Sequence, residues 1–215
     1  MKLFSLDASI RAQGSVSREI AAIVEGSWKE VHPDGSVTHR QVGLSPIPST
    51  LWANAVFAPY TPEEQRSDEQ RKAIAFATEL ADELITSDSL LVALPLYNFG
   101  ISQHFKTWVD VAITDPRLAA SGDRPLAGKP AVLVIVRGGA YGPGTPREGW
   151  DHATGWVRRI LEDVWGLNLR IVEAEFTLAG QNPALDEFIE LAAQMRASAE
   201  LLAAEHGKHL AGIAA

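Results

Sequence analysis

The chain has 215 residues, 46% of them hydrophobic and 21% charged, which is the composition of an ordinary globular domain with one large core. Nineteen basic and twenty-seven acidic residues give a net charge of −8, which argues against nucleic acid or an anionic membrane as a partner. The absence of cysteine excludes disulfides, thiolate catalysis and cysteine-ligated metal centres. The apolar runs are far shorter than the ~20 residues of a membrane span, and Asp7 interrupts any export-signal core. We therefore expect a cytoplasmic protein with a single domain over residues 1–215.

The first part of the chain predicts a strand, a helix and a second strand. Residues 2–7 are short and apolar, residues 15–31 carry an apolar stripe at helical spacing, and residues 37–42 alternate weakly. Residues 43–60 contain three prolines and show no clear period, which predicts a long surface segment. Residues 61–64, Thr-Pro-Glu-Glu, are typical of a helix start, and apolar residues at helical spacing follow them.

The rest of the chain continues the alternation. Residues 89–94 predict a buried strand, Ser102 is expected to cap the next helix, and the wholly apolar residues 131–136 predict a strand covered on both faces. The remaining predicted elements are a polar loop at 115–129, a glycine- and proline-rich loop at 138–149, a helix around 156–164, a fifth strand at 168–176, and a last helix from 185 onward that follows Asn182-Pro183. Five strands alternating with five helices predict an α/β fold, in which a parallel sheet carries helices on both faces.

In such sheets a ligand binds beyond the carboxyl ends of the strands, at the point where the strand order reverses. The loops after the first, third and fourth strands are therefore the informative ones. The first of them contains Ser9, Ser15 and Ser17, so that hydroxyls and free helix N–H groups meet in the pattern of a phosphate site. Serines that only cap a helix explain this loop equally well. It is neither a P-loop nor a dinucleotide fingerprint, because the required glycine patterns are missing.

The loop after the third strand reads Leu96-Tyr97-Asn98-Phe99, two aromatic rings flanking an amide. A flat heteroaromatic ligand needs ring faces for stacking and an amide for its polar edge, although aromatic residues more often pack in a core.

The loop after the fourth strand begins Val136-Arg137-Gly138-Gly139, where paired glycines allow the backbone to approach a ligand and Arg137 would favour an anionic ring. A plain turn with a solvated arginine is the simpler explanation of this loop alone. Taken together, however, the three loops predict a phosphate at one end of a site and a flat ring at the other, which describes FMN.

These residues resemble the FMN-dependent NADH azoreductases, also described as NADH:quinone reductases, of the flavodoxin-like fold, over essentially the whole chain. The family's phosphate loop is matched by Ser9 and by Ser15-Val16-Ser17, and its Met-Tyr-Asn-Phe motif by residues 96–99. Its Ser-Arg-Gly-Gly motif is matched by residues 136–139, with Val136 in place of the serine. Residues 113–126 lack the family's common Thr-Phe-Arg-Tyr segment, which in relatives helps to cover the flavin and shape the substrate pocket.

The resemblance implies a three-layer sandwich with strand order 2-1-3-4-5 and a homodimer with one FMN per subunit and active sites near the interface. It implies a ping-pong cycle, in which NADH or NADPH reduces the flavin and the flavin then reduces a quinone or an azo compound. The flavin carries the chemistry, so no protein acid or base is expected; Asn98 and the backbone of Gly138 and Gly139 would tune the flavin edge.

Two other classes fit a similar topology. A flavodoxin-type electron carrier binds FMN without a pocket for an organic substrate, whereas the long segments 43–60 and 115–129 favour a built-up pocket. A phospho-receiver domain needs an acidic cluster, and Asp7 is solitary. No metal is expected: His206 and His209 have ligand-like spacing but no acidic or cysteine partner nearby, which predicts a solvated face near the chain end.

Overall fold

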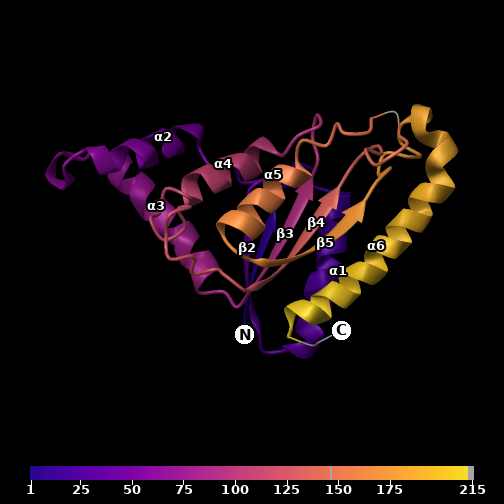
Figure 1. Ribbon diagram of the computed structural model, residues 1–215, viewed down its shortest axis with the longest axis horizontal. Coiled ribbons are helices and arrows are strands. Elements are labelled where there is room, and N and C mark those ends of the chain that lie inside the picture. The colour runs from indigo at the N-terminus through magenta and orange to yellow at the C-terminus, as the bar shows by residue number, and fades with distance from the viewer. Residues whose placement is uncertain (146, 213–215) are drawn as a thin grey trace.

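The computed structural model describes residues 1–145 and 147–212, and these contain one five-stranded parallel sheet (Figure 1). The strands are β1 (Lys2–Asp7), β2 (Ser36–Gln41), β3 (Ser89–Pro95), β4 (Pro130–Val136) and β5 (Asn168–Ala174). Their order in the sheet is β2-β1-β3-β4-β5, with every neighbouring pair parallel, as the sequence predicts. The chain moves outward from β1 to β2 and then returns to the other side of β1, which places the reversal between β1 and β3.

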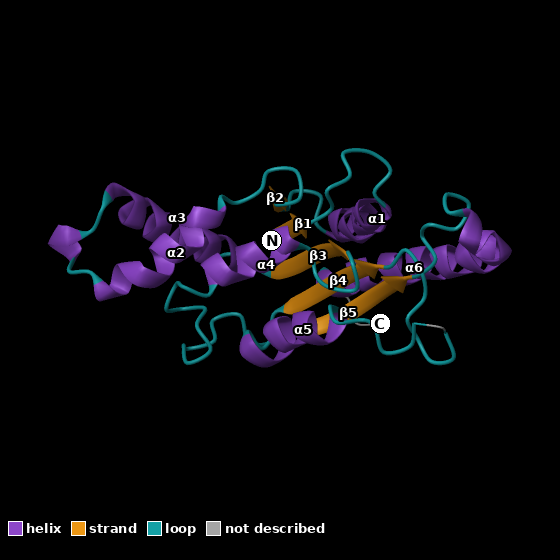
Figure 2. Ribbon diagram, turned by 90° about the horizontal axis from the view of Figure 1, so that it is seen from above, coloured by secondary structure: helices purple, strands orange, loops and turns teal. Residues whose placement is uncertain are grey.

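Helices cover both faces of the sheet, as expected (Figures 1 and 2). Helices α1 (Val16–Val31) and α6 (Ile189–Leu210) pack together on one face; α3 (Asp68–Ile85), α4 (Gln103–Ala112) and α5 (Thr154–Arg158) lie on the other. Every residue of β3 is buried and β4 is buried after its first residue, which confirms the prediction of strands covered on both sides. Within the described ranges, no helix is long and apolar enough to cross a membrane.

Aromatic rings fasten α4 to the sheet. Trp108 stacks at 6.0 Å from Phe4 of β1 and 5.5 Å from Phe105, and meets Trp165 edge-on at 5.6 Å. These fully or nearly fully buried rings hold the middle of α4 against the sheet. Ser102, at the N-cap position, makes no side-chain capping bond; its hydroxyl donates instead to the Ala8 carbonyl oxygen at 3.4 Å. The predicted cap is therefore replaced by a tie between α4 and the β1 loop.

The helix start predicted at residues 61–64 is wrong. Thr61 ends a 3₁₀ turn (Ala58–Tyr60), a second 3₁₀ turn follows at Glu63–Gln65, and α3 begins only at Asp68. Ser67 accepts a hydrogen bond from the Gln70 backbone N–H, and the Gln70 side chain accepts one from the Ser67 N–H. This reciprocal capping box satisfies two end groups of the helix at once, which Thr61 cannot do here.

The segment 43–60 is not a plain surface loop, because it contains α2 (Ser49–Phe57). Pro48 stands at the N-cap position, where the lack of an N–H costs the helix nothing, and Pro59 lies in the 3₁₀ turn beyond it. The prolines therefore bracket a helix that we did not predict. With the start of α3, α2 forms an arm that projects from the body at one end of the molecule (Figures 1 and 2).

The prediction that His206 and His209 lie on a solvated face near the chain end is wrong for His206. The side chain of His206 is only 8% exposed, and its Nδ1 atom has no hydrogen-bond partner among the described residues. Burial, and then the positive charge of Arg170, lower the pKa of His206 below its ordinary value. The described residues contain no group of three or more potential metal ligands.

The contact between α1 and α6 depends on Gly207, which generates the first prediction. A Cβ atom at this position would meet the Val24 carbonyl oxygen and lie 2.7 Å from Ser27 Cβ, so Gly207→Ala forces the two helices apart. We expect the unfolding free energy to fall by about 1–3 kcal/mol, measured by urea denaturation. Gly26 of α1 is the matched control: its Cβ would meet nothing within 4 Å, and Gly26→Ala should stabilise by roughly 0.5–1 kcal/mol. Equal effects of the two substitutions would contradict the packing argument.

Candidate functional site

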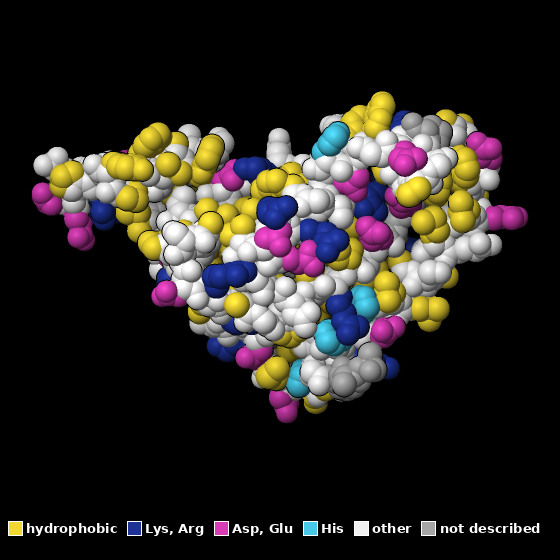
Figure 3. Space-filling view, viewed as in Figure 1, with side chains coloured by type: hydrophobic (Ala, Val, Ile, Leu, Met, Phe, Trp, Pro, Cys, Tyr) yellow, Lys and Arg dark blue, Asp and Glu magenta, His cyan; other side chains and the backbone are white. Residues whose placement is uncertain are grey.

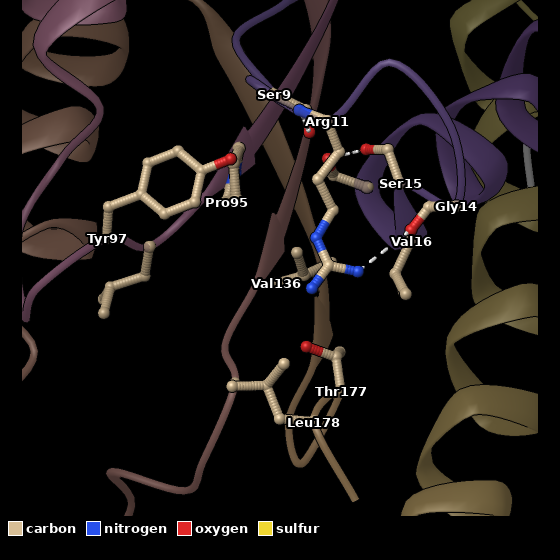
Figure 4. A pocket seen from close by; sticks show the side chains of 13 residues that line it. Ser9, Arg11, Gly14, Ser15, Val16, Pro95, Tyr97, Val136, Thr177 and Leu178 are labelled. Atoms are coloured by element: carbon tan, nitrogen blue, oxygen red, sulfur yellow. Dashed lines mark hydrogen bonds between the residues drawn. The ribbon is translucent and has the colours of Figure 1, made fainter. Parts of the chain in front are cut away.

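A cavity of about 180 Å³ opens at the carboxyl edge of the sheet, where the chain leaves β1 and β3 (Figure 4). The loops after β1, β3 and β4 line it, as the sequence predicts, and the loop after β5 adds Thr177 and Leu178. The strand-order rule directs attention to the first three loops, but β5 runs beside β4 and its carboxyl end lies at the same edge. The contribution of this fourth loop is what the sequence argument missed.

The β1–α1 loop is held from inside by an ion pair. Asp7, at the end of β1, is largely buried and accepts hydrogen bonds from the Ser9 N–H at 3.0 Å and from Arg18 Nε at 2.6 Å. The Arg18 Nη1 atom also donates to the carbonyl oxygens of Arg11, at 2.9 Å, and Ala12, at 3.2 Å. One arginine on α1 thus joins the strand end to the middle of the loop, a role that no sequence pattern indicated.

The serines of this loop are buried and line the cavity. Ser15 caps α1 by accepting from the Arg18 N–H at 3.4 Å, and its hydroxyl lies 3.2 Å from that of Ser17. The capping role and a role at the cavity are therefore compatible. Gly43 packs against the backbone of this loop. A Cβ at Gly43 would meet the Ser9 carbonyl oxygen and lie 2.8 Å from the Ala8 carbonyl carbon, so there is no room for a side chain at this position.

The loop after β3 forms a tight two-residue turn. Tyr97 and Gly100 exchange both backbone hydrogen bonds, at 3.0 and 2.9 Å. The residues between them take positive φ angles, 47° at Asn98 and 68° at Phe99, which L-residues adopt only at a cost. Asn98 is one of the residues that best tolerates this conformation, whereas Phe99 is held there by its surroundings. The Tyr97 hydroxyl accepts from the Ile10 N–H at 3.1 Å and so connects this turn to the β1–α1 loop.

The glycine loop after β4 is attached to the loop after β5 through its backbone. The Thr177 N–H donates to the Arg137 carbonyl oxygen at 3.1 Å, and the Leu178 N–H to that of Gly138 at 3.2 Å. A Cβ on Gly138 would lie 2.7 Å from Leu178 Cδ1, so the Leu178 side chain packs against the space that glycine leaves. The two loops together form one wall of the cavity.

Arg137 is expected to lie beside an anionic ring at the ligand site, but its side chain points away from that site. It is 5% exposed, does not line the cavity described above, and donates at 2.8 Å to each of Asp151, Glu173 and Thr154. Burial alone would lower the pKa of Arg137, but the two carboxylates outweigh it and raise the pKa. Asp151, one of these two carboxylates, has a pKa below its ordinary value. Hydrogen bonds from Thr154 and Ala153 and the charge of Arg137 outweigh the effect of its burial. Arg137 therefore anchors the base of the glycine loop.

A second, larger cavity of about 720 Å³ adjoins the first and shares Leu96, Tyr97, Gly138 and Leu178 with it. Its walls are aromatic. Phe99 meets Trp150 edge-on at 5.2 Å and Tyr141 at 6.1 Å, with the Arg147 guanidinium 5.7 Å from its ring centre. Across the cavity, the rings of Phe176 and Phe188 stack at 4.7 Å.

The structure brings together eleven of the twelve residues predicted to bind a cofactor, all except Arg137. Those that line the first cavity are Ser9, Ser15, Val16, Ser17, Leu96, Tyr97, Val136 and Gly138; Asn98, Phe99 and Gly139 line the second. Residues 113–126 line neither cavity. Instead, Arg117 pairs with Asp115 and with Asp82 of α3, and Leu118 accepts a hydrogen bond from the Trp165 indole.

Comparison with known proteins agrees with this geometry. The profile of a family described as having a flavodoxin-like fold matches residues 1–198. An FMN-dependent NADH:quinone oxidoreductase of Frankia casuarinae is 41% identical over 199 residues, which cover 92% of this chain and 94% of that protein. Its counterpart in Frankia alni, with the same description, is 38% identical over 200 residues, which cover 92% and 94%.

Among solved structures, an FMN-dependent NADH-azoreductase from Bacillus anthracis, in complex with FMN, superposes with a TM-score of 0.78. The match covers 98% of this chain and 100% of that one. At 16% sequence identity this likeness concerns the fold.

The turn at Asn98 generates the second prediction. The Asn98 side chain makes no hydrogen bond within the described chain, so its effect on stability comes mainly from its positive φ. Asn98→Gly should raise the unfolding free energy by up to about 1 kcal/mol, and Asn98→Ala should lower it by a similar amount, because only glycine adopts this φ without steric cost. Thermal unfolding of both variants checks this. Equal midpoints for the two variants would show that the turn is not strained at Asn98.

Proposed function

This chain belongs to the protein family that is described as having a flavodoxin-like fold. We propose that it is an FMN-dependent NAD(P)H oxidoreductase that reduces quinones and azo compounds. The observation that carries this proposal is the pair of adjoining cavities. One is small and lined by serine hydroxyls at a helix N-terminus; the other is large and lined by aromatic rings. The curated relatives described above are FMN-dependent NADH:quinone oxidoreductases, which supports the same activity here.

The residues present fit FMN. The hydroxyls of Ser9, Ser15 and Ser17 and the N–H groups of α1 are suited to hold the phosphate, because both donate to an anion. A side chain at Gly138 would contact Leu178. The bare backbone of Gly138 and Gly139 is suited to lie against the edge of the flavin ring, and Asn98 supplies an amide there. When bound, FMN supplies hydride and two-electron transfer between NAD(P)H and the acceptor.

The protein's own contribution is to position both reactants and to exclude water. The turn that carries Asn98 and Phe99 is held by two backbone hydrogen bonds and by the Tyr97 hydroxyl, and Tyr97 lines both cavities. The Phe99 and Tyr141 rings line the larger cavity and offer faces and edges against which a planar acceptor or a nicotinamide can stack. Quinones and azo compounds are planar and conjugated, which suits such walls.

A flavodoxin-type electron carrier is not favoured. A carrier needs no space for an organic substrate, whereas the aromatic cavity of about 720 Å³ lies within the size range of small-molecule sites. The use of NADH, which is an intracellular donor, supports the expected location in the cytoplasm.

The third prediction tests the proposal directly. The purified protein should show flavin absorbance bands, lose them when NADH is added without oxygen, and recover them when a quinone follows. Steady-state NADH oxidation with a quinone should proceed without any partner protein. A protein that binds flavin but does not turn over NADH and quinone would be a carrier, and the oxidoreductase proposal would fail.

The Ser9→Ala, Ser15→Ala, Ser17→Ala triple variant is the companion measurement. It removes hydroxyl donors to a charged phosphate, and we expect FMN affinity to fall by roughly 100-fold or more. The capping loss at Ser15 also costs stability, so circular dichroism should first show that the variant is folded. If the variant binds FMN as tightly as the unmodified protein does, this loop is not the phosphate site.

We further propose that the protein is a homodimer whose interface includes the arm formed by α2. Large apolar side chains are exposed there: Trp52 is 46%, Phe57 62% and Tyr60 84% accessible. Figure 3 shows hydrophobic side chains gathered along this arm. A monomer seldom exposes such a cluster, and a second copy of the chain is the partner that family membership supports.

The fourth prediction concerns this interface. Trp52→Glu with Phe57→Glu should shift the sedimentation coefficient from that of a dimer to that of a monomer, because the charges would be buried unpaired. Leu201→Glu, at a 76% exposed position on α6, serves as the control and should leave the dimer intact. A double variant that sediments like the unmodified dimer would place the interface elsewhere.

A further inference from the structure

The side chain of Arg11 extends from the β1–α1 loop across the small cavity toward Thr177 and Leu178 (Figure 4). Its Nη1 atom donates to the Gly14 carbonyl oxygen at 3.5 Å, and its Nη2 atom to the Gln181 side-chain oxygen at 3.4 Å. Both distances are at the long end of the hydrogen-bonding range, and both acceptors are neutral. The guanidinium therefore borders the serine hydroxyls with weak partners only.

Its surroundings distinguish Arg11 from Arg18 and Arg137, the two arginines that hold the loops of the site in place. Arg18 is neutralised by Asp7 at 2.6 Å, and Arg137 by Asp151 and Glu173 at 2.8 Å. Arg11 forms no ion pair with any carboxylate in the described ranges 1–145 and 147–212. An excess positive charge next to hydroxyl and N–H donors is the environment that an anion requires.

The backbone of Arg11 is fixed while its side chain spans the gap. Its N–H donates to the Ser9 hydroxyl at 3.3 Å, and its carbonyl oxygen accepts from Arg18 Nη1 at 2.9 Å. The head of the side chain reaches Gln181, 170 residues further along the chain, in the loop that follows β5. Arg11 is thus the side chain that joins the serine loop to the opposite wall across the cavity mouth.

We propose that Arg11 binds the phosphate of FMN and, through Gln181, fastens the loop after β5 to the phosphate end of the cofactor. The inference rests on the proposed function and deepens it by adding a charged ligand to a phosphate site otherwise built from neutral donors. A guanidinium suits this double role because its planar fork presents several N–H donors at once, some for phosphate oxygens and one for an amide oxygen. Lysine, with a single ammonium, supplies the charge without the bridge.

The fifth prediction compares FMN with riboflavin, which lacks the phosphate. The full-length protein, freed of flavin by dialysis, is titrated with each flavin and the quenching of flavin fluorescence gives the two dissociation constants. Arg11→Gln should weaken FMN binding about tenfold or more and leave riboflavin binding within about twofold. Raising the salt concentration should weaken FMN binding less in Arg11→Gln than in the unmodified protein, because the screened charge is gone. Arg159→Gln, at an exposed arginine that begins a π-helical turn (Arg159–Val164) after α5, is the matched control and should change neither constant.

The bridge is tested by a double-mutant cycle. Gln181→Ala should weaken FMN binding in the presence of Arg11 and have no further effect in the Arg11→Gln background. Arg11→Lys should retain part of the FMN affinity and be insensitive to Gln181→Ala. Equal losses for FMN and riboflavin in Arg11→Gln, or no loss for either, would overturn Arg11 as a phosphate ligand. Additive effects of the two substitutions would overturn the bridge alone. An unmodified protein that binds neither flavin would instead refute the proposed function.

Discussion

The site depends on one constraint, the reversal of strand order between β1 and β3. Because the chain leaves β1 in one direction and returns to its other side, the connections that follow these two strands run to opposite faces of the sheet and leave a crevice at their carboxyl ends. Every residue argued to contact a ligand lies at this edge, in a loop, at a strand end or in the first turn of α1. The buried aromatic group around Trp108 and the glycine contact of α6 with α1 hold the layers against the sheet, and so keep the edge open and fixed.

Within that crevice, ion pairs divide the arginines by function. Arg18 and Arg137 are each matched with carboxylates and are structural: one holds the β1–α1 loop against Asp7, and the other anchors the glycine loop to Asp151 and Glu173. Buried pairs of this kind fix geometry more reliably than they add stability, since desolvation offsets most of their attraction. Among the described residues that line the small cavity, Arg11 is the one cation; no carboxylate pairs with it, and it points across the cavity. The net charge of −8 therefore coexists with a local site suited to an anion.

The two cavities differ in chemistry as the two ends of a flavin nucleotide differ. The small one is lined by hydroxyl and N–H donors; the large one is bounded by Phe99 and Tyr141, which meet edge-on, and by the stacked Phe176 and Phe188. A strained turn at Asn98 and Phe99 lines the large cavity, and backbone strain of this kind persists where the surrounding structure fixes it. Family membership and the geometry of the edge thus lead to the same function by independent routes.

The sequence by itself determined the sheet, its strand order through the family resemblance, and the three loops that meet at the site. Those conclusions rest on local signals: apolar runs, helix-capping serines, and a tyrosine-asparagine-phenylalanine motif whose neighbours are next to it in the chain. Only the tertiary structure decided the partners of charged side chains, because Arg11 meets Gln181 across 170 positions and Arg137 meets Glu173 across 36. It also decided that α3 begins at Asp68, that 43–60 contains a helix, and that His206 is buried. In each of these cases a short pattern permitted two outcomes, and packing against residues distant in the sequence selected one.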